Sequence, residues 1–289
     1  MQHTIKSPIL IEGIALHCGL NVSMTIMPAA EDTGIIFKRS DILDQDKQVI
    51  AAHFANVVDS SMCTKIANEH QVSVATIEHL MSALWASNID NAYIILDGPE
   101  VPIMDGSADY FVEAIRKTGI LKQSKPRQII KVLKPIKVEA GDNEITLMPT
   151  ENSDLSIEFS IEFNHPAIGS QSLDTDSGLI EDYYQKIGKA RTFGFVGDME
   201  KLQQIGLAKG ASLNNAIGLD SEKVLNTEGL HYPDEFVRHK ILDCIGDLYL
   251  AGKRLVCKVR AHKSSHALNN DALHKLFADD SAYLYSNLG

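Results

Sequence analysis

The pattern of apolar and polar positions predicts a helix over residues 234–251. Apolar side chains recur there at helical spacing, at Ile241, Ile245, Leu248 and Tyr249. His239, Asp243 and Asp247 form a second stripe at intervals of four residues. Because side chains at i and i+4 are neighbours on a helix, His239 and Asp243 are placed to bind one metal ion. Taken alone, such a pair is more often a solvated helix face, so partners elsewhere in the chain must decide.

A second helix is predicted over residues 75–86, with a candidate partner. Its apolar residues occupy i, i+3, i+4, i+7 and i+8, at Ile77, Leu80, Met81, Leu84 and Trp85. The pattern leaves Glu78, His79 and Ser82 off the buried stripe. A catalytic zinc ion takes three protein ligands and leaves a fourth position to water. We therefore expect His79 to complete the ligand set begun by the His/Asp pair on the other helix.

Glu78 adjoins His79 but points roughly 100° around the helix, because an α-helix has 3.6 residues per turn. A carboxylate beside a metal-bound water can accept its proton, which is the chemistry of a zinc hydrolase. The alternative for Glu78 is an ordinary exposed helix glutamate.

The remaining elements indicate an α+β fold in two halves. Each of the two helices is followed by an apolar segment expected to be a strand, at residues 91–96 and 255–259, which suggests a metal site at the junction of the halves. Further strands are expected at residues 22–26, 129–133, 145–148 and 155–163, and further helices at residues 107–118 and 179–188. A polar, basic stretch with a proline at residues 121–127 predicts domains 1–125 and 126–289.

Composition supports a globular protein. The chain has 289 residues, of which 44% are hydrophobic, enough for two ordinary cores. Its longest apolar run, residues 92–96, is far shorter than the ~20 residues that span a bilayer, and its first residues do not resemble a signal peptide. We therefore expect no integral membrane segment and a cytoplasmic location.

Charge and cysteine content exclude some other classes. The net charge of −11 disfavours nonspecific nucleic-acid binding, although the basic residues Arg238, Lys240 and Lys263 near the predicted site can hold a phosphorylated ligand. The four cysteines form no CxxC pair, so neither a disulfide framework nor a thiolate zinc cluster is expected.

Two other segments carry candidate chemistry. Residues 190–195 place a hydroxyl, two aromatic rings and a glycine in a predicted loop, which either lines a pocket or packs as a surface loop on its own domain. His266 lies where a predicted strand ends and a helix begins, so it either faces a cleft or is a capping or surface histidine.

Six segments, in order over nearly the whole chain, resemble the UDP-3-O-acyl-N-acetylglucosamine deacetylases of lipid A biosynthesis, the LpxC family. They are Ile-Glu-His-Leu at 77–80, Pro-Ile-Met-Asp-Gly-Ser at 102–107, Phe-Asn-His-Pro at 163–166, Ala-Arg-Thr-Phe-Gly-Phe at 190–195, Phe-Val-Arg-His-Lys with Leu-Asp at 236–243, and Lys-Ser with His-Ala-Leu-Asn-Asn at 263–270.

The resemblance implies a two-domain sandwich, each domain a mainly antiparallel sheet packed on helices, with the active site at the domain interface. It implies hydrolysis of the 2-acetamido group of UDP-3-O-acyl-N-acetylglucosamine to the free amine and acetate, the committed step of lipid A assembly. His79, His239 and Asp243 match the zinc ligands, as their spacing also predicts. Iron(II) is an alternative metal in the cell.

The resemblance also assigns catalytic roles. Glu78 matches the general base, His266 the second catalytic group, and Asp247 the carboxylate that orients His266. We expect the Thr192 hydroxyl and protonated His266 to stabilise the oxyanion, and either His266 or Glu78 to protonate the departing amine.

Substrate contacts follow from the same family pattern. Phe193 is expected near the nucleotide, with Phe195 close to it, and Lys240 is expected to hold a charged group. Met62 and Cys63 match the first-half edge of the site, and residues 208–217 fall in the region that shapes the passage for the acyl chain. Asn143 stands where some members carry a lysine, so a basic contact to the nucleotide from that strand is in doubt. His17 matches a family motif, but a structural role is an equal alternative.

The expected partner is the UDP-linked substrate, with no nucleic acid, and a monomer is the default. Two rivals remain open: another zinc amidohydrolase, such as a peptidase or esterase on a related scaffold, and a metal-binding homologue without catalysis.

Overall fold

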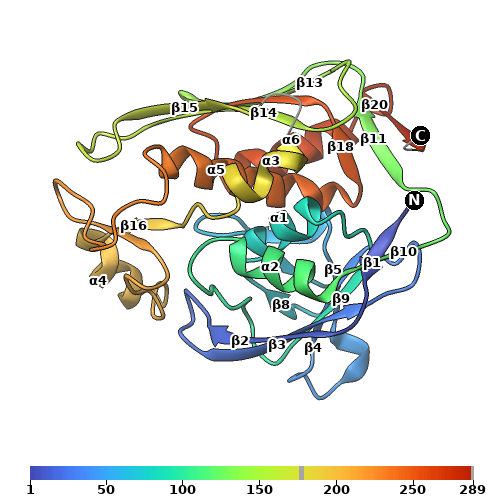
Figure 1. Ribbon diagram of the computed structural model, residues 1–289, viewed down its shortest axis with the longest axis horizontal. Helices are drawn as coiled ribbons and strands as arrows, with labels where there is room; N and C mark the ends of the chain where they lie inside the picture. The colour runs from blue at the N-terminus through green and yellow to red at the C-terminus, as the bar shows by residue number, and fades with distance from the viewer. Residues whose placement is uncertain (176–178, 288–289) are drawn as a thin grey trace.

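The computed structural model describes residues 1–175 and 179–287 and has its main helices in a central layer between two five-stranded sheets (Figure 1). One sheet comes from the first half of the chain and the other from the second half. Most strand pairs are antiparallel, which confirms the predicted two-domain α+β class. No helix in the described ranges has the length and apolarity needed to cross a membrane.

The first sheet alternates buried and exposed side chains. Its strands, in spatial order, are β2 (Ile9–Ile14), β3 (Asn21–Pro28), β9 (Ala92–Leu96), β4 (Ile35–Arg39) and β5 (Val49–Ala51). Val22, Met24 and Ile26 of β3 are buried at every second position, as a strand with one face on a core requires. Two helices cover the buried face of this sheet, α1 (Glu78–Ala86) and α2 (Asp109–Thr118).

The second sheet repeats the plan with different connections. Its strands, in spatial order, are β12 (Ile136–Ala140), β13 (Asn143–Met148), β19 (Lys258–His262), β14 (Ser156–Glu162) and β15 (Ser170–Asp174). The helices beneath it are α3 (Leu179–Lys186), α5 (Glu235–Leu248) and α6 (His266–Phe277).

Smaller elements complete the fold. The first half adds β1 (His3–Ile5), which pairs with β10 (Ile120–Lys122), and the sheet of β6 (Val57–Asp59), β7 (Lys65–Ala67) and β8 (Ser73–Val74). The second half adds the sheet of β18 (Arg254–Val256), β11 (Gln128–Val132) and β20 (Tyr283–Asn287). Short 3₁₀ helices occupy Gln45–Lys47, Phe54–Asn56 and Tyr249–Ala251.

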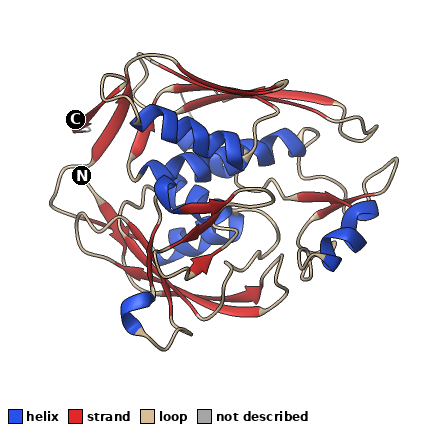
Figure 2. Ribbon diagram, turned by 180° about the vertical axis from the view of Figure 1, so that it is seen from behind, coloured by secondary structure: helices blue, strands red, loops and turns tan. Residues whose placement is uncertain are grey.

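One substructure projects from the side of the layered body (Figure 2). It contains β16 (Phe193–Phe195), α4 (Val196–Gln204) and β17 (Ile217–Leu219). β16 and β17 run parallel and pair Phe193 with Ile217. Part of the loop predicted at residues 190–195 is therefore a strand, a correction that the local pattern does not reveal because its pairing partner lies more than 20 residues downstream.

Close contact between α1 and α5 joins the halves. A Cβ atom added at Gly246 of α5 would lie 2.0 Å from the carbonyl oxygen of Glu78, so only glycine permits this approach. As a result α1 is buried around nearly its whole circumference, including Glu78, His79 and Ser82. These residues lie off the apolar stripe as predicted, but they are not exposed, because α5 packs on α1 and the Ser82 hydroxyl lies 2.7 Å from the Tyr183 hydroxyl of α3.

Most predicted elements are present with slightly shorter bounds, and one is divided. The strand expected at residues 255–259 is interrupted at Cys257, because β18 pairs with β11 of one sheet while β19 pairs with β13 and β14 of another. An unbroken apolar run gives no sign that the chain changes sheets. The domain boundary at residue 125 remains a proposal and falls between β10 and β11.

Candidate metal centre and active site

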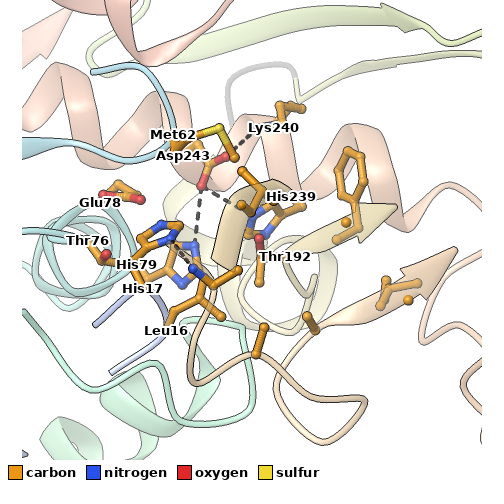
Figure 3. Close-up of a pocket in the computed structure, with 18 of the residues that line it drawn as sticks. Leu16, His17, Met62, Thr76, Glu78, His79, Thr192, His239, Lys240 and Asp243 are labelled. Carbon is orange, nitrogen blue, oxygen red and sulfur yellow. Dashed lines mark hydrogen bonds and ion pairs between the residues drawn. The ribbon is translucent and has the colours of Figure 1, made fainter. Parts of the chain in front are cut away.

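Three candidate ligands meet where α1 contacts α5 (Figure 3). His79 comes from the first turn of α1, and His239 and Asp243 come from successive turns of α5. Asp243 Oδ1 lies 3.4 Å from Nε2 of each histidine, and the three candidate ligand atoms lie within 4.8 Å of one another. Spacing along the sequence thus predicted a set of side chains that the fold brings together.

The donor set fits a divalent metal. Asp243 Oδ1 is buried, and no described residue donates a hydrogen bond to it. His239 Nδ1 lies 3.0 Å from the carbonyl oxygen of Ala190, which fixes the proton on Nδ1 and leaves the lone pair of Nε2 directed at the cluster. Burial lowers the pKa of His239 to about 3, so its ring is neutral at pH 7, as metal ligation requires.

Asp243 remains ionised in this buried setting. Burial alone would raise the pKa of its carboxyl, but neighbouring His239 and Lys240 outweigh burial and hold the pKa well below its usual value. Since His239 is neutral at pH 7, Lys240 is the counter-charge there, with Nζ 2.8 Å from Asp243 Oδ2. One carboxylate oxygen therefore pairs with a lysine and the other faces the two histidines.

Glu78 occupies the first position of α1, beside the cluster. Its Oε2 accepts a hydrogen bond from the amide of Thr64 at 3.0 Å, and its Oε1 lies 4.0 Å from His266 Nε2. Burial raises the pKa of the Glu78 carboxyl. A carboxylate in this position takes up a proton more readily than an exposed one.

His266 begins α6, and the Ser265 side chain caps that helix. The imidazole Nδ1 lies 2.8 Å from Asp247 Oδ2, so the ring is held by the third residue of the α5 stripe. Burial would lower the pKa of His266, but Asp247 and Glu78 outweigh it and raise the pKa to about 9. His266 is therefore a cation at pH 7, facing the same space as Glu78.

Thr192 is positioned by a buried network at the start of the projecting substructure. Its amide donates to the carbonyl of Gly106 at 2.8 Å, and Arg191 Nε donates to Glu235 Oε1 at 2.9 Å. Gly106 has φ +87°, and a Cβ there would meet the Asn215 carbonyl oxygen at 2.2 Å. The glycine of the Pro-Ile-Met-Asp-Gly-Ser segment therefore allows this close packing.

These groups line a cavity of about 480 Å³. The polar groups form one part of its wall. Apolar side chains of the projecting substructure form another part: Val196, Met199, Leu202, Ala211, Leu213, Ala216 and Ile217. Most of the residues expected to shape an acyl passage, between 208 and 217, are thus on the cavity wall.

The remaining predicted site residues are divided between the wall and the region behind it. Those lining the cavity are His17, Met62, Thr192, Phe193, Lys240 and His266. Among the described residues, Cys63, Phe195, Asp247 and Asn143 are not part of the lining. Asp247 acts from behind His266, Phe195 packs against the rings of Phe163 and His165, and Asn143 begins β13.

Cys63 and two of the predicted basic residues take no direct part in the cavity lining. Burial raises the pKa of the Cys63 thiol, which keeps it protonated. Arg238 pairs with Asp234 and Lys263 with Glu162, so of the three basic residues expected near the site only Lys240 lines the cavity.

Three buried polar residues were not predicted as site residues, although Asn269 lies in the last of the six family segments. Glu100 accepts hydrogen bonds from the amides of His17 and Cys18 and from the Thr76 hydroxyl, all at 2.8 Å. Thr64 and Asn269 both donate to Asp247. Their partners are distant in sequence or lie across the two halves, and no periodic pattern marks them.

Fold and site together define a two-domain α+β protein with a candidate metal centre buried where the halves meet. A family model described as LpxC, UDP-3-O-acyl N-acetylglycosamine deacetylase, matches residues 2–278. The chain belongs to this family, as the six motifs predicted.

Curated relatives agree over nearly the full chain. The UDP-3-O-acyl-N-acetylglucosamine deacetylase of Acidithiobacillus ferrooxidans is 46% identical over 284 residues, covering 98% of this chain and 91% of the relative. The protein of the same name from Myxococcus xanthus is 43% identical over 282 residues, covering 98% of this chain and 88% of the relative.

Proposed function

We propose that this chain hydrolyses the 2-acetamido group of UDP-3-O-acyl-N-acetylglucosamine, giving the free amine and acetate in the committed step of lipid A biosynthesis. One observation supports the proposal most strongly. The cluster of His79, His239 and Asp243 lines the same cavity as Glu78 and His266. Family membership supplies the substrate class.

The ion we assign to the cluster is zinc, held by His79, His239 and Asp243. Two imidazoles and one carboxylate form a typical catalytic zinc set, and iron(II) is the alternative in the cell. Bound zinc supplies a Lewis acid and lowers the pKa of water to ~7.

Glu78 is the general base in this proposal. Its raised pKa and its place beside the ligands suit a carboxylate that removes a proton from water as the oxygen attacks the amide carbonyl. The Thr192 hydroxyl and the His266 imidazolium are the donors for the oxyanion that develops. Both line the cavity, and Asp247 keeps His266 charged.

Departure of the amine requires a proton. His266 carries one at pH 7, and Glu78 acquires one during the attack, so either group can deliver it. The 4.0 Å distance between Glu78 Oε1 and His266 Nε2 supports this alternative, because groups so close together can reach one leaving nitrogen.

Substrate binding is assigned to residues on and beside the cavity wall. Lys240 holds a charged group, Phe193 lies toward the nucleotide, and Met62 forms the first-half edge. Phe195 and Cys63 do not line the cavity, so their assigned contribution is to support these contacts from outside the wall. Lys240 Nζ lies 5.8 Å from the centroid of the Phe193 ring, so these two side chains form one corner of the site. The apolar wall formed by residues 208–217 takes the acyl chain.

The test is release of acetate from purified UDP-3-O-acyl-N-acetylglucosamine, with peptides and simple esters as competing substrates. We expect acetate and free amine in equal amounts, loss of both after chelation, and recovery with added zinc. Turnover of peptides or esters without acetate release from the UDP-sugar would overturn the proposal.

A further inference from the structure

We propose that Thr64 is a positioning residue that joins the two acid–base groups of the site across the interface between the halves. Its amide holds Glu78, and its hydroxyl holds Asp247, the carboxylate behind His266. The inference rests on the function proposed above, and it adds a first-half residue to the support of His266, which otherwise comes from α5 and α6.

Thr64 makes both contacts from a buried position directly before β7. Its amide donates to Glu78 Oε2 at 3.0 Å, and its Oγ1 donates to Asp247 Oδ1 at 2.5 Å. The side chain must be the donor in the second contact, because an ionised carboxylate only accepts. Only 2% of Thr64 is exposed, so water does not replace either contact.

Thr64 is the hydrogen-bond donor to one of the two carboxylate oxygens of Asp247. Oδ2 already accepts from His266 Nδ1 and Asn269 Nδ2, each at 2.8 Å. Asn269 is fixed in turn by the Ser264 hydroxyl, also at 2.8 Å. Thr64 is the described donor on the opposite oxygen, Oδ1, so it fixes the plane of the carboxylate and thereby the direction of the His266 ring.

Because one residue holds both carboxylates, their relative position is set by the geometry of a single amino acid. The Thr64 carbonyl also accepts from the amide of Ile77 at 3.4 Å, which joins the same residue to the start of α1. Threonine is stiff at χ1, so its hydroxyl keeps a defined direction relative to its amide. The 4.0 Å separation of Glu78 and His266 is therefore maintained from the first half of the chain.

Thr64→Val tests this role, since valine keeps the amide and the shape but lacks the hydroxyl. We expect kcat to fall by about 10–100-fold, the usual effect of losing an outer hydrogen-bond partner, while KM and zinc content stay near the parent values. Thr64→Ser restores the hydroxyl and should recover most of kcat. An unchanged kcat in Thr64→Val, or equal loss in the serine variant, would overturn the inference.

Two comparisons separate positioning from general destabilisation. Thr4→Val removes another buried hydroxyl, one that donates to the Asn91 carbonyl at 2.6 Å from β1, and should lower stability but leave kcat unchanged. In an Asp247→Ala background, Thr64→Val should cause little further loss of kcat, because its hydroxyl acts through Asp247. Fully additive losses would contradict that route.

An NMR measurement tests the positioning role of Thr64 independently of enzymatic activity. The His266 Nδ1 proton signal of metal-free protein should shift in Thr64→Val and stay at the parent position in Thr64→Ser and Thr4→Val. If the parent protein releases no acetate, the proposed function fails, and this spectrum still tests Thr64. An unshifted His266 signal in Thr64→Val would show that its hydroxyl does not position the pair.

Discussion

Helices α1 and α5 contribute carboxylates to one buried site, yet the two groups have opposite acid–base character. Glu78 of α1 is 3% exposed and Asp243 of α5 is 4% exposed, so burial does not distinguish them. The pKa of Glu78 is raised by burial, whereas that of Asp243 is held well below its usual value by His239 and Lys240 despite burial. The two carboxylates differ in how close a cation lies: Lys240 Nζ is 2.8 Å from Asp243 Oδ2, whereas His266 Nε2 is 4.0 Å from Glu78 Oε1.

The contrast shows how equal burial supports two roles. A carboxylate kept ionised suits a cation ligand, and one whose neutral form is more accessible suits proton transfer. Lys240, three residues before Asp243, pairs with the oxygen that faces away from the histidines. Glu78 has no comparable lysine or arginine pair among the described contacts.

Asp243→Asn should have the largest effect, because it removes the ionised carboxylate that α5 contributes to the site. The change removes the negative charge while preserving shape, and it leaves Lys240 without its carboxylate partner. We expect metal affinity to fall by more than the ~100-fold typical of losing an outer partner, and acetate release to fall with it. Metal content after dialysis measures the first effect; full retention of zinc would contradict the ligand assignment.

Glu78→Gln should remove the proton acceptor that α1 contributes and leave metal binding intact. The glutamine keeps the size of the side chain but cannot take up a proton, so acetate release should fall by at least ~100-fold while zinc content is unchanged. Kinetics and metal analysis on the same preparation provide the comparison. Loss of zinc in this variant would show that Glu78 belongs to the ligand set.

Gly246→Ala tests the contact between the two helices. The added methyl would lie 2.0 Å from the Glu78 carbonyl oxygen, so α1 and α5 must separate, and we expect the free energy of unfolding to fall by about 1–3 kcal/mol or more. Gly197→Ala in α4 is the matched control, because its Cβ meets no atom within 4 Å. Chemical denaturation of both variants measures the difference, and equal stabilities would contradict the close packing.

The pH dependence of the free energy of unfolding tests the charge of His266, the cation that faces Glu78. Its pKa is raised from about 6.5 to about 9, so its ion pair stabilises the fold fully below pH 6.5 and is lost as pH rises through 9. Metal-free protein should lose on the order of 1–3 kcal/mol across this window relative to His266→Gln, since one pKa unit is worth about 1.4 kcal/mol. Denaturation at pH 6 and pH 9.5 measures it; parallel curves would contradict the raised pKa.

Local periodicity predicts the elements that carry this site. The apolar stripes around His79 and His239 predicted both helices, and the i, i+4 spacing predicted the α5 stripe. His266 was placed correctly at the start of a helix. These features depend on residues close together in sequence, where helical geometry determines which side chains share a face.

Contacts between distant segments were not predictable in the same way. The pairing of β16 with β17, the change of sheet at Cys257 and the burial of the polar face of α1 all depend on remote partners. Thr64 illustrates the limit most clearly, because its hydroxyl contacts a residue 183 positions away. No pattern in its own neighbourhood encodes that contact.

In the proposed metal site, Asp243 and not Glu78 joins the two histidines in holding zinc. Anomalous diffraction from crystals of the zinc-loaded protein, recorded on both sides of the zinc absorption edge, tests this ligand set. We predict one strong peak about 2.0–2.2 Å from His79 Nε2, His239 Nε2 and Asp243 Oδ1, with Glu78 outside bonding distance. A peak bonded to Glu78, or no peak at the three predicted ligands, would show that this ligand set is wrong.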